Sequence, residues 1–493
     1  MTITLREDVV PVERRSSERT LLEQAFNRAA GSPLVGGNSI RLLRNAAENY
    51  PAWLEAIAAA ERTIHFETYI IWDDDAGKTF IDALSEKARA GVRVRLIYDW
   101  LGAIGKTRRS FWDTLTRAGA EVRSFNRPRL SSPFGWLHRD HRKALIVDSR
   151  VAFISGLCVG QQWLGDPRTG TEPWRDTGVD LRGPAVDMAE QAFARAWSVA
   201  GPSDLSENAP PESKSVGSVA VRVVASEPWS TRMLRLDQLM AGAARERLWL
   251  TDAYFAGTPE YVQALRAAAE DDVDVRLLVP GASDIPMLQA ISRAGYRPLL
   301  EAGVRVYEWR GSMLHAKTAV VDDHWARVGS SNLNVASWIG NWELDVAVDD
   351  RTFGAAMAAM YLVDLGNSTE IVLSESRIVD RRTGARSRLA LRGGVGSAGR
   401  LAAGALRLGN TASAMITERR VLGLADARAA AITGVGFLGL AVIAFVWPSV
   451  VAIPLALVIV WIGVAMVAKA HSLRKQREEA GRAPLRVVEA GSD

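Results

Sequence analysis

Cysteine is almost absent from this chain. Only Cys158 is a cysteine among 493 residues, which excludes a disulfide framework and a metal site built from several thiolates. Histidine is also scarce, with six residues, and no histidine–carboxylate spacing is typical of a metal site. We therefore expect no metal and no other cofactor.

Two further features are missing. The first 19 residues are polar and charged and lack the apolar core of a signal peptide. The net charge is only +4 at pH 7, which is too small a positive excess to predict nucleic acid as a partner. A hydrophobic content of 48% and a charged content of 24% are ordinary for a globular chain, so composition assigns no function.

A long uncharged segment lies near the C-terminus. Residues 429–468 contain no charged side chain, and Trp447-Pro448-Ser449 divides them into two runs that are each long enough to span a bilayer. Two such runs in tandem predict a transmembrane hairpin, with a re-entrant hairpin as the alternative. Basic residues flank both sides, so both ends and the large N-terminal part are expected in the cytoplasm.

The arginine-rich residues 367–428 precede this segment, and a basic tail, residues 469–493, follows it. Two interpretations of the first region stay open. It is either a solvated linker or a basic juxtamembrane collar that lies on an anionic membrane surface.

The rest of the chain predicts a duplicated α/β fold. Strand-like and helix-like segments alternate, and the second half repeats the first: GVRVRLIY corresponds to DVDVRLLV, and Glu67-Thr68-Tyr69 to Asp252-Ala253-Tyr254. Alternation of this kind favours a largely parallel sheet. We expect an N-terminal extension with a short helix at 1–36, a first lobe at 37–200, a linker at 201–217 and a second lobe at 218–366.

Two octapeptides, His141–Asp148 and His315–Asp322, close the two copies, and each has the pattern H-x-K-x-x-x-x-D. Their apolar, β-branched runs predict buried strands, on which His and Lys project from one face. A single match is weak, but two at equivalent places predict one pocket holding both pairs. Such a pocket suits a phosphodiester: lysines hold the anionic oxygens, one imidazole attacks phosphorus and the other transfers protons.

Each imidazole needs a carboxylate on its second ring nitrogen to fix its tautomer. Asp176 follows His141 by 35 residues, and Glu343 follows His315 by 28. Each is the candidate for the histidine of its own half. Gly329-Ser330-Ser331-Asn332 lies downstream of the second octapeptide. Such a tetrapeptide alone is more typical of a turn, but its position after the octapeptide favours a role in the site.

The paired motifs, with Gly-Ser-x-Asn and the later Asn-x-Glu, resemble the phospholipase D superfamily. The wider context between Leu21 and Leu365 resembles its bacterial cardiolipin synthase branch, in stretches such as AFNRAAGSPLVGGNSIRLL, HRDHRK and WRDTGVDLRGPAV. The resemblance implies two lobes with pseudo-two-fold symmetry, one shared metal-independent site and a phosphatidyl-histidine intermediate. The best-known cardiolipin synthases carry membrane segments before the catalytic part, whereas here the predicted hairpin follows it. We expect this hairpin to hold the protein at the inner membrane of a bacterium.

Residue roles follow from the resemblance. His141 is expected to be the nucleophile and His315 the general acid and base, an order that could be reversed. The remaining site residues are expected to act as follows: Lys143, Lys317 and Asn332 bind phosphate, Ser330 also binds substrate, Asp176 and Glu343 orient His141 and His315, and Asp148 and Asp322 form structural ion pairs.

One departure from the family pattern is Cys158, which stands where asparagine is usual in the first half. We interpret it as a small buried residue. The predicted function is transfer of a phosphatidyl group to phosphatidylglycerol or another alcohol. Alternatives are a phospholipase D hydrolase, a nuclease of the same superfamily, and an inactive membrane scaffold, which the intact motifs argue against.

Overall fold

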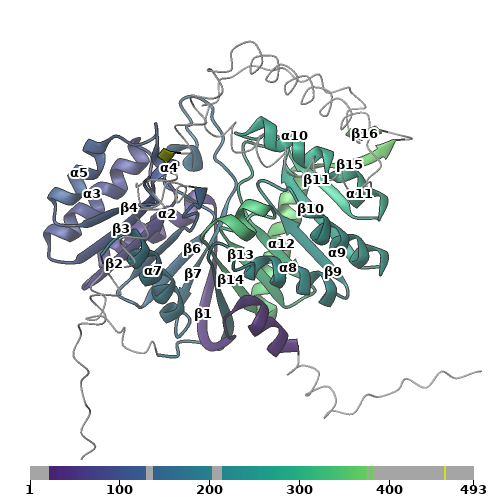
Figure 1. Cartoon of the computed structure of the whole chain (residues 1–493), viewed down its shortest axis with the longest axis horizontal. Helices are drawn as coiled ribbons and strands as arrows, with labels where there is room; N and C mark the ends of the chain where they lie inside the picture. Colours follow the sequence, from purple (N-terminus) through teal and green to yellow (C-terminus); the bar gives the residue numbers. More distant parts are fainter. Residues whose placement is uncertain (1–21, 129–136, 203–213, 375–376, 381–459, 462–493) are drawn as a thin grey trace, which may run out of the picture. The chain divides into compact units, whose positions relative to one another are not determined.

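Two lobes with the same order of strands and helices form the body of the protein (Figure 1). The computed structural model describes residues 22–128, 137–202, 214–374, 377–380 and 460–461. Both lobes belong to one compact unit.

The strands of the first lobe are β1 (Val35–Arg44), β2 (Thr63–Thr68), β3 (Arg93–Asp99), β4 (Glu121–Phe125), β5 (Ala144–Val147), β6 (Val151–Ser155) and β7 (Thr177–Arg182). Its helices are α2 (Asn45–Ala59), α3 (Asp75–Arg89), α4 (Trp100–Ala103), α5 (Arg109–Arg117), α6 (Gln161–Leu164) and α7 (Val186–Ala200).

The strands of the second lobe are β8 (Val219–Ser226), β9 (Arg247–Thr251), β10 (Asp274–Pro280), β11 (Arg305–Trp309), β12 (Thr318–Val321), β13 (Trp325–Gly329) and β14 (Glu343–Asp349), followed by β15 (Ser368–Ser374) and β16 (Arg377–Asp380). Its helices are α8 (Arg232–Ala243), α9 (Pro259–Glu270), α10 (Pro286–Ala294), α11 (Tyr296–Glu301), the π-helix η2 (Ala336–Gly340) and α12 (Arg351–Gly366).

The sheet shows the duplication directly. Its order is β16-β15-β11-β10-β9-β12-β13-β14-β8-β1-β7-β6-β5-β2-β3-β4. Read outward from the antiparallel β1–β8 pair at the centre, the first lobe runs β1-β7-β6-β5-β2-β3-β4 and the second runs β8-β14-β13-β12-β9-β10-β11. The two lobes are therefore the same motif, joined along their first strands.

The prediction of a largely parallel sheet is wrong. Among the described strands, parallel pairing is confined to β2–β3–β4 and β9–β10–β11. The cause is the tight turn after each octapeptide, because β5 and β12 fold directly back onto β6 and β13 as hairpins. Asp148 and Asp322 occupy these turns with φ of 54° and 51°, the left-handed region that Asp tolerates better than most residues.

Local sequence explains where several elements begin. Asp74 caps α3 through the N–H of Gly77, and Asp350 caps α12 through the N–H of Phe353, which satisfies amides that have no partner inside the helix. The four residues of β5 and the four of β12 are all buried, so these strands lie at the centre of their lobes.

The lobes share a core. One apolar cluster draws residues from both lobes and includes the inner faces of α7 and α12, while two further clusters fill the separate lobes. Helix α7 of the first lobe also packs against β8, and α12 of the second lobe against β1. Burial of apolar area across this boundary stabilises the pair of lobes as one body.

The predicted hairpin, collar and tail lie outside the described residues, apart from 377–380 and the helical residues 460–461. Within the ranges given above, none of the helices combines the length and apolar character needed to cross a bilayer.

Candidate active site

Each octapeptide enters a central strand, but the strand begins only after its lysine. Strand β5 starts directly after Lys143 and β12 directly after Lys317. Each lysine Nζ donates a hydrogen bond to the main-chain carbonyl of the histidine two residues earlier, His141 or His315. The histidine and lysine of each motif therefore lie together at the entry to their strand, as the spacing predicted.

The main chain around each histidine pairs with the opposite lobe. The N–H of His141 donates to the carbonyl of Trp342 at 2.9 Å, and the N–H of Trp342 donates to the carbonyl of Arg139 at 2.7 Å. The second histidine has the mirrored arrangement, with His315 N–H donating to Arg175 O at 2.7 Å and Arg175 N–H donating to Met313 O at 2.9 Å. Each motif is thus held in place by the other lobe.

This exchange reverses the predicted carboxylate pairing. Nδ1 of His141 lies 2.9 Å and 3.0 Å from the two carboxylate oxygens of Glu343. Nδ1 of His315 lies 2.7 Å from Oδ2 of Asp176. The assignment of Asp176 to His141 and of Glu343 to His315 is wrong, because Trp342 brings Glu343 to His141 and Arg175 brings Asp176 to His315.

The two carboxylates fix the imidazole tautomers. A carboxylate only accepts hydrogen bonds, so each histidine carries its proton on Nδ1 and presents an unprotonated Nε2 for chemistry. Burial alone would raise the pKa of Asp176, but His315 and then Lys317 hold it below its usual value. Burial likewise opposes ionisation of Glu343, and its contact with His141 brings its pKa below the usual range.

The imidazoles themselves are held neutral. Burial lowers the pKa of His141 despite the opposing effect of Glu343. Burial and the charge of Lys317 lower the pKa of His315 to about 3. Burial removes each ring from water, which disfavours its charged imidazolium form. At neutral pH both rings are therefore neutral in the free site.

Further groups support Glu343. The Ser330 hydroxyl donates to Oε2 at 2.5 Å, and Asn341 Nδ2 donates to Oε1 at 3.2 Å. Ser330 is fully buried and also accepts from the N–H of Leu344. The structure therefore places Ser330 behind Glu343, where it holds the carboxylate, rather than open to substrate as predicted.

Asp176 has a different support. The indole N–H of Trp163 donates to Oδ2 at 3.1 Å, and the N–H of Thr177 donates to Oδ1 at 2.9 Å. Gly156 stands at the position equivalent to Ser330, and a Cβ there would lie 2.2 Å from the Asp176 carboxylate. The shorter aspartate therefore requires glycine beside it, whereas the longer glutamate has a serine.

The candidate phosphate ligands are buried around the two histidines. Lys143 is 1% exposed and Lys317 is fully buried; burial lowers the pKa of Lys317 to about 8. Asn332 is 4% exposed, and its Oδ1 makes no hydrogen bond within the described part of the chain. Cys158 occupies the equivalent place in the first lobe, and burial raises the pKa of its thiol, so it is neutral.

Aromatic side chains that sequence reasoning missed surround the histidines. The Tyr69 ring lies 5.2 Å from that of His141, and the Tyr254 ring lies 5.9 Å from that of His315. Trp163 and Trp174 each lie 5.6 Å from the His315 ring. The correspondence of Glu67-Thr68-Tyr69 with Asp252-Ala253-Tyr254 was the signal that could have identified the tyrosines.

The closing aspartates lie at the other end of the strands. The Asp148 carboxylate accepts from the main-chain N–H groups of Glu61, Arg62 and Thr63 at 2.7–2.9 Å. Asp322 accepts in the same way from the N–H groups of residues 245–247. In the described residues these carboxylates bind main chain and do not form the expected ion pairs, so their role is to tie β5 to β2 and β12 to β9.

Comparison with known proteins places this geometry in a family. A family model described as cardiolipin synthase, PLD-like domain, matches residues 53–162 and 238–362. Cardiolipin synthase of Alkalihalophilus pseudofirmus is 32% identical over 371 residues, which cover 74% of this chain and 73% of that protein. Cardiolipin synthase A of Pseudomonas aeruginosa is 34% identical over 362 residues, or 73% of each chain.

This chain belongs to the cardiolipin synthase family of phospholipase D-like proteins. The resemblance predicted from the two motifs is therefore confirmed. A crystal structure of phosphatidylserine synthase from Haemophilus influenzae has a TM-score of 0.57 at 15% identity and covers 71% of this chain and 92% of its own. At that identity it supports the duplicated α/β fold alone.

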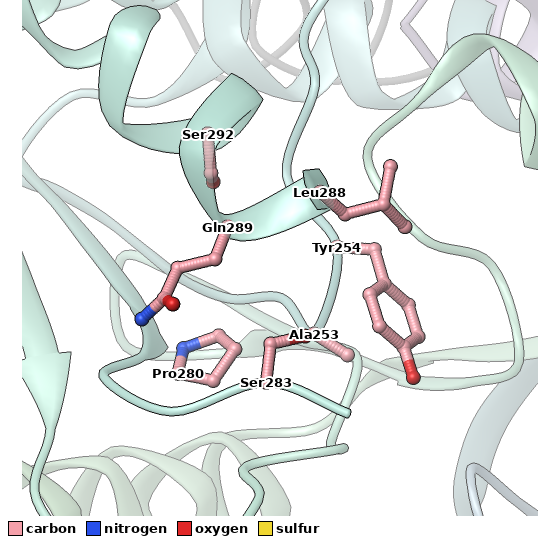
Figure 2. A pocket seen from close by; sticks show the side chains of 7 residues that line it. All are labelled: Ala253, Tyr254, Pro280, Ser283, Leu288, Gln289 and Ser292. Carbon is pink, nitrogen blue, oxygen red and sulfur yellow. The ribbon is translucent and has the colours of Figure 1, made fainter. Parts of the chain in front are cut away.

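This cardiolipin synthase family member also has a small pocket beside Tyr254. The pocket is lined by residues at and just after the ends of β9 and β10 and by side chains of α10 (Figure 2). Its polar wall consists of Ser283, Gln289 and Ser292. It borders one of the two tyrosines that flank the histidines, so it adjoins the candidate active site on the side of the second lobe.

Proposed function

We propose that this protein is a phosphatidyltransferase of the cardiolipin synthase type, which transfers a phosphatidyl group to phosphatidylglycerol or another alcohol through a phosphohistidine. The observation that carries the proposal is the pair of buried imidazoles, each with Nδ1 bound to an ionised carboxylate of the opposite lobe. Sequence identity to curated cardiolipin synthases over almost three quarters of the chain supports the reaction class.

The lysines bind the diester. Lys143 and Lys317 stand two residues after the histidines, and both charges act on both imidazoles. A phosphodiester carries one negative charge, so the two ammonium groups and the Asn332 amide hold its non-bridging oxygens and stabilise the charge that develops at phosphorus.

His141 attacks phosphorus through Nε2. The nitrogen is unprotonated because Glu343 accepts the Nδ1 proton and because burial disfavours the imidazolium. Formation of the N–P bond leaves a positive charge on the ring that the ionised Glu343 stabilises. The bond from phosphorus to the headgroup oxygen breaks in the same step.

His315 supplies the proton for the leaving oxygen. In the free site the ring is neutral, but an anionic diester favours the imidazolium, so the proton is taken up as substrate binds. Asp176 accepts from Nδ1 and keeps the charged ring in place. After headgroup release, the neutral His315 removes the proton of the acceptor hydroxyl, which attacks phosphorus and frees His141.

We place the enzyme at the inner membrane of a bacterium, held by residues 429–468, with the catalytic lobes in the cytoplasm. The uncharged run and its basic flanks support this placement. A topology reporter fused after Asp493 is expected to report the cytoplasm, whereas a periplasmic signal would contradict the hairpin.

The test of function is product analysis. Membranes that contain the protein are incubated with phosphatidylglycerol labelled in its acyl chains, and the same is done with His141→Ala. Cardiolipin with release of glycerol, absent in the variant, is the expected result. Phosphatidic acid as the sole product would identify a hydrolase, and cleavage of DNA with inert lipid would identify a nuclease.

A further inference from the structure

The two tyrosines beside the histidines differ in the groups that they contact. Tyr69 and Tyr254 each lie over the histidine and lysine of their own lobe, with Lys143 Nζ 5.3 Å and Lys317 Nζ 5.9 Å from the ring centroids. Tyr69 packs its ring against Gly102, where a Cβ would lie 3.0 Å from the ring. Main chain therefore packs directly on this face of the Tyr69 ring.

On the Tyr254 side, the tyrosine hydroxyl contacts a carboxylate. The Tyr254 hydroxyl donates to Oδ1 of Asp284 at 2.8 Å. Asp284 is exposed in the segment between β10 and α10. Within the described chain no lysine, arginine or histidine lies within 4.0 Å of this carboxylate. Through the Tyr254 hydroxyl, this carboxylate adjoins the His315 side of the candidate active site.

A carboxylate at this place discriminates between lipid headgroups by their charge and their hydrogen-bond donors. It repels a phosphate in direct contact, but it accepts hydrogen bonds from neutral hydroxyl groups, and a hydrogen bond to a charged group is stronger than one between neutral groups. The pocket next to Tyr254 adds the hydroxyl and amide groups of Ser283, Gln289 and Ser292 (Figure 2). The surroundings of Asp284 therefore suit a polyol attached to a phosphodiester.

We propose that Asp284, positioned by Tyr254, binds the glycerol headgroup of the acceptor through its secondary hydroxyl. This proposal rests on the proposed function and on His315 as the acid and base, because Tyr254 stands beside His315. The leaving glycerol of the donor and the acceptor glycerol react at the same histidine, so one subsite serves both in turn.

Transfer to the acceptor uses two hydroxyl groups of one glycerol. The secondary hydroxyl of the acceptor donates to the Asp284 carboxylate, which directs the primary hydroxyl of the same glycerol toward Nε2 of His315. The primary hydroxyl gives its proton to His315 as its oxygen bonds to phosphorus. The N–P bond to His141 breaks, and its electron pair returns to the imidazole nitrogen.

Partition of one intermediate between two alcohols tests the proposal. The full-length enzyme in vesicles of acyl-labelled phosphatidylglycerol is given equal concentrations of 1,2-propanediol and 1-propanol, which differ by one hydroxyl. The two phosphatidyl alcohols are separated and counted. Because both arise from the same phosphohistidine, their ratio is independent of how much active enzyme is present.

The unsubstituted enzyme is expected to favour the diol by about tenfold or more, and Asp284→Ala is expected to lose most of that preference. Tyr254→Phe is expected to fall between the two. Asp271→Ala, which removes an exposed carboxylate at the end of α9, is the matched control and is expected to keep the preference.

An unchanged diol preference in Asp284→Ala would overturn the proposal, as would a preference for ethanolamine over the diol at pH 7, since that would mark a cation site. Absence of any phosphatidyl alcohol and of any phosphohistidine in the unsubstituted enzyme would instead contradict the proposed function itself.

Discussion

Nδ1 of His141 lies 2.9 Å from Oε2 of Glu343, a residue 202 positions later and in the other lobe. The reciprocal contact joins His315 to Asp176. Neither lobe therefore contains an oriented histidine by itself. The duplication has produced one site whose two halves are each completed by the partner half.

Removing the charge of Glu343 should disable the nucleophile. Glu343→Gln keeps the size of the side chain, but a neutral amide neither fixes the imidazole tautomer nor stabilises the ring cation. We expect kcat to fall by about 10²–10⁴ in a steady-state assay with phosphatidylglycerol vesicles. The matched control is Glu190→Gln, because Glu190 is also a buried glutamate bound to a histidine, His65, at 2.7 Å.

The crossed pairing is tested by comparison with Asp176→Asn. A donor with a p-nitrophenol leaving group needs no proton from His315. With this donor Asp176→Asn should keep a faster burst than Glu343→Gln, because only the latter acts on the attacking ring. A faster burst in Glu343→Gln, or kcat lost equally in Glu190→Gln, would contradict the assignment.

The charge of Lys317 should limit kcat/KM at alkaline pH. Burial lowers its pKa to about 8, so the ammonium is intact below that pH and is lost above it. We expect kcat/KM, which reports the free enzyme, to decline above about pH 8, while kcat persists to higher pH because bound phosphate stabilises the ammonium. Lys317→Arg stays charged and should abolish this decline. A decline that persists in Lys317→Arg would assign it to another group.

Asp148 and Asp322 should matter for stability. Each carboxylate accepts several main-chain N–H groups, so Asp148→Asn and Asp322→Asn are expected to lower the free energy of unfolding by about 1–3 kcal/mol each, measured by denaturant titration. The folded molecules of both variants should keep the kcat of the unsubstituted enzyme. A large loss of kcat without a loss of stability would instead assign these residues a role in catalysis.

The Asp148 contribution should depend on pH. Burial would raise its pKa, but the N–H groups of Thr63, Glu61 and Arg62 hold it below the usual value. The stabilisation is therefore complete above the unfolded pKa of about 3.9 and is lost as pH falls through the lower folded pKa. The difference between native protein and Asp148→Asn should shrink in that acidic window, which unfolding curves at several pH values would show.

Cys158 should be unreactive in the native state. The side chain is 2% exposed, burial raises its pKa, and only the thiolate reacts quickly. Iodoacetamide at pH 7.5 should label the denatured protein and leave the native one unlabelled, as counted by mass spectrometry. Rapid native labelling with loss of activity would show an accessible thiolate.

The sequence was sufficient to predict the family and the pairing of each histidine with its lysine, because the H-x-K spacing is local and its repetition is specific. It was insufficient for the partner of each histidine. Asp176 and Glu343 follow the nearer motif in the chain, and the exchange depends on main-chain pairs of Arg139 with Trp342 and of Met313 with Arg175, which have no signature in residue spacing.

The sheet direction and the role of Ser330 were mispredicted for the same reason. The antiparallel return of β5 and β12 is decided by three-residue turns that begin at Asp148 and Asp322, which a strand–helix alternation does not reveal. A serine after a glycine is typical of a turn, and its contact with Glu343 becomes visible only when β13 and β14 are paired.

In the proposed mechanism His141, completed by Glu343, carries the phosphatidyl group and His315 acts on the alcohols. His315→Ala is mixed with phosphatidyl-p-nitrophenol labelled at phosphorus, quenched in alkali and digested, and the peptides are sequenced by mass spectrometry. With the base for the second step missing, we predict that the label accumulates on His141. Label on another residue, or no covalent label while substrate is consumed, would contradict the account.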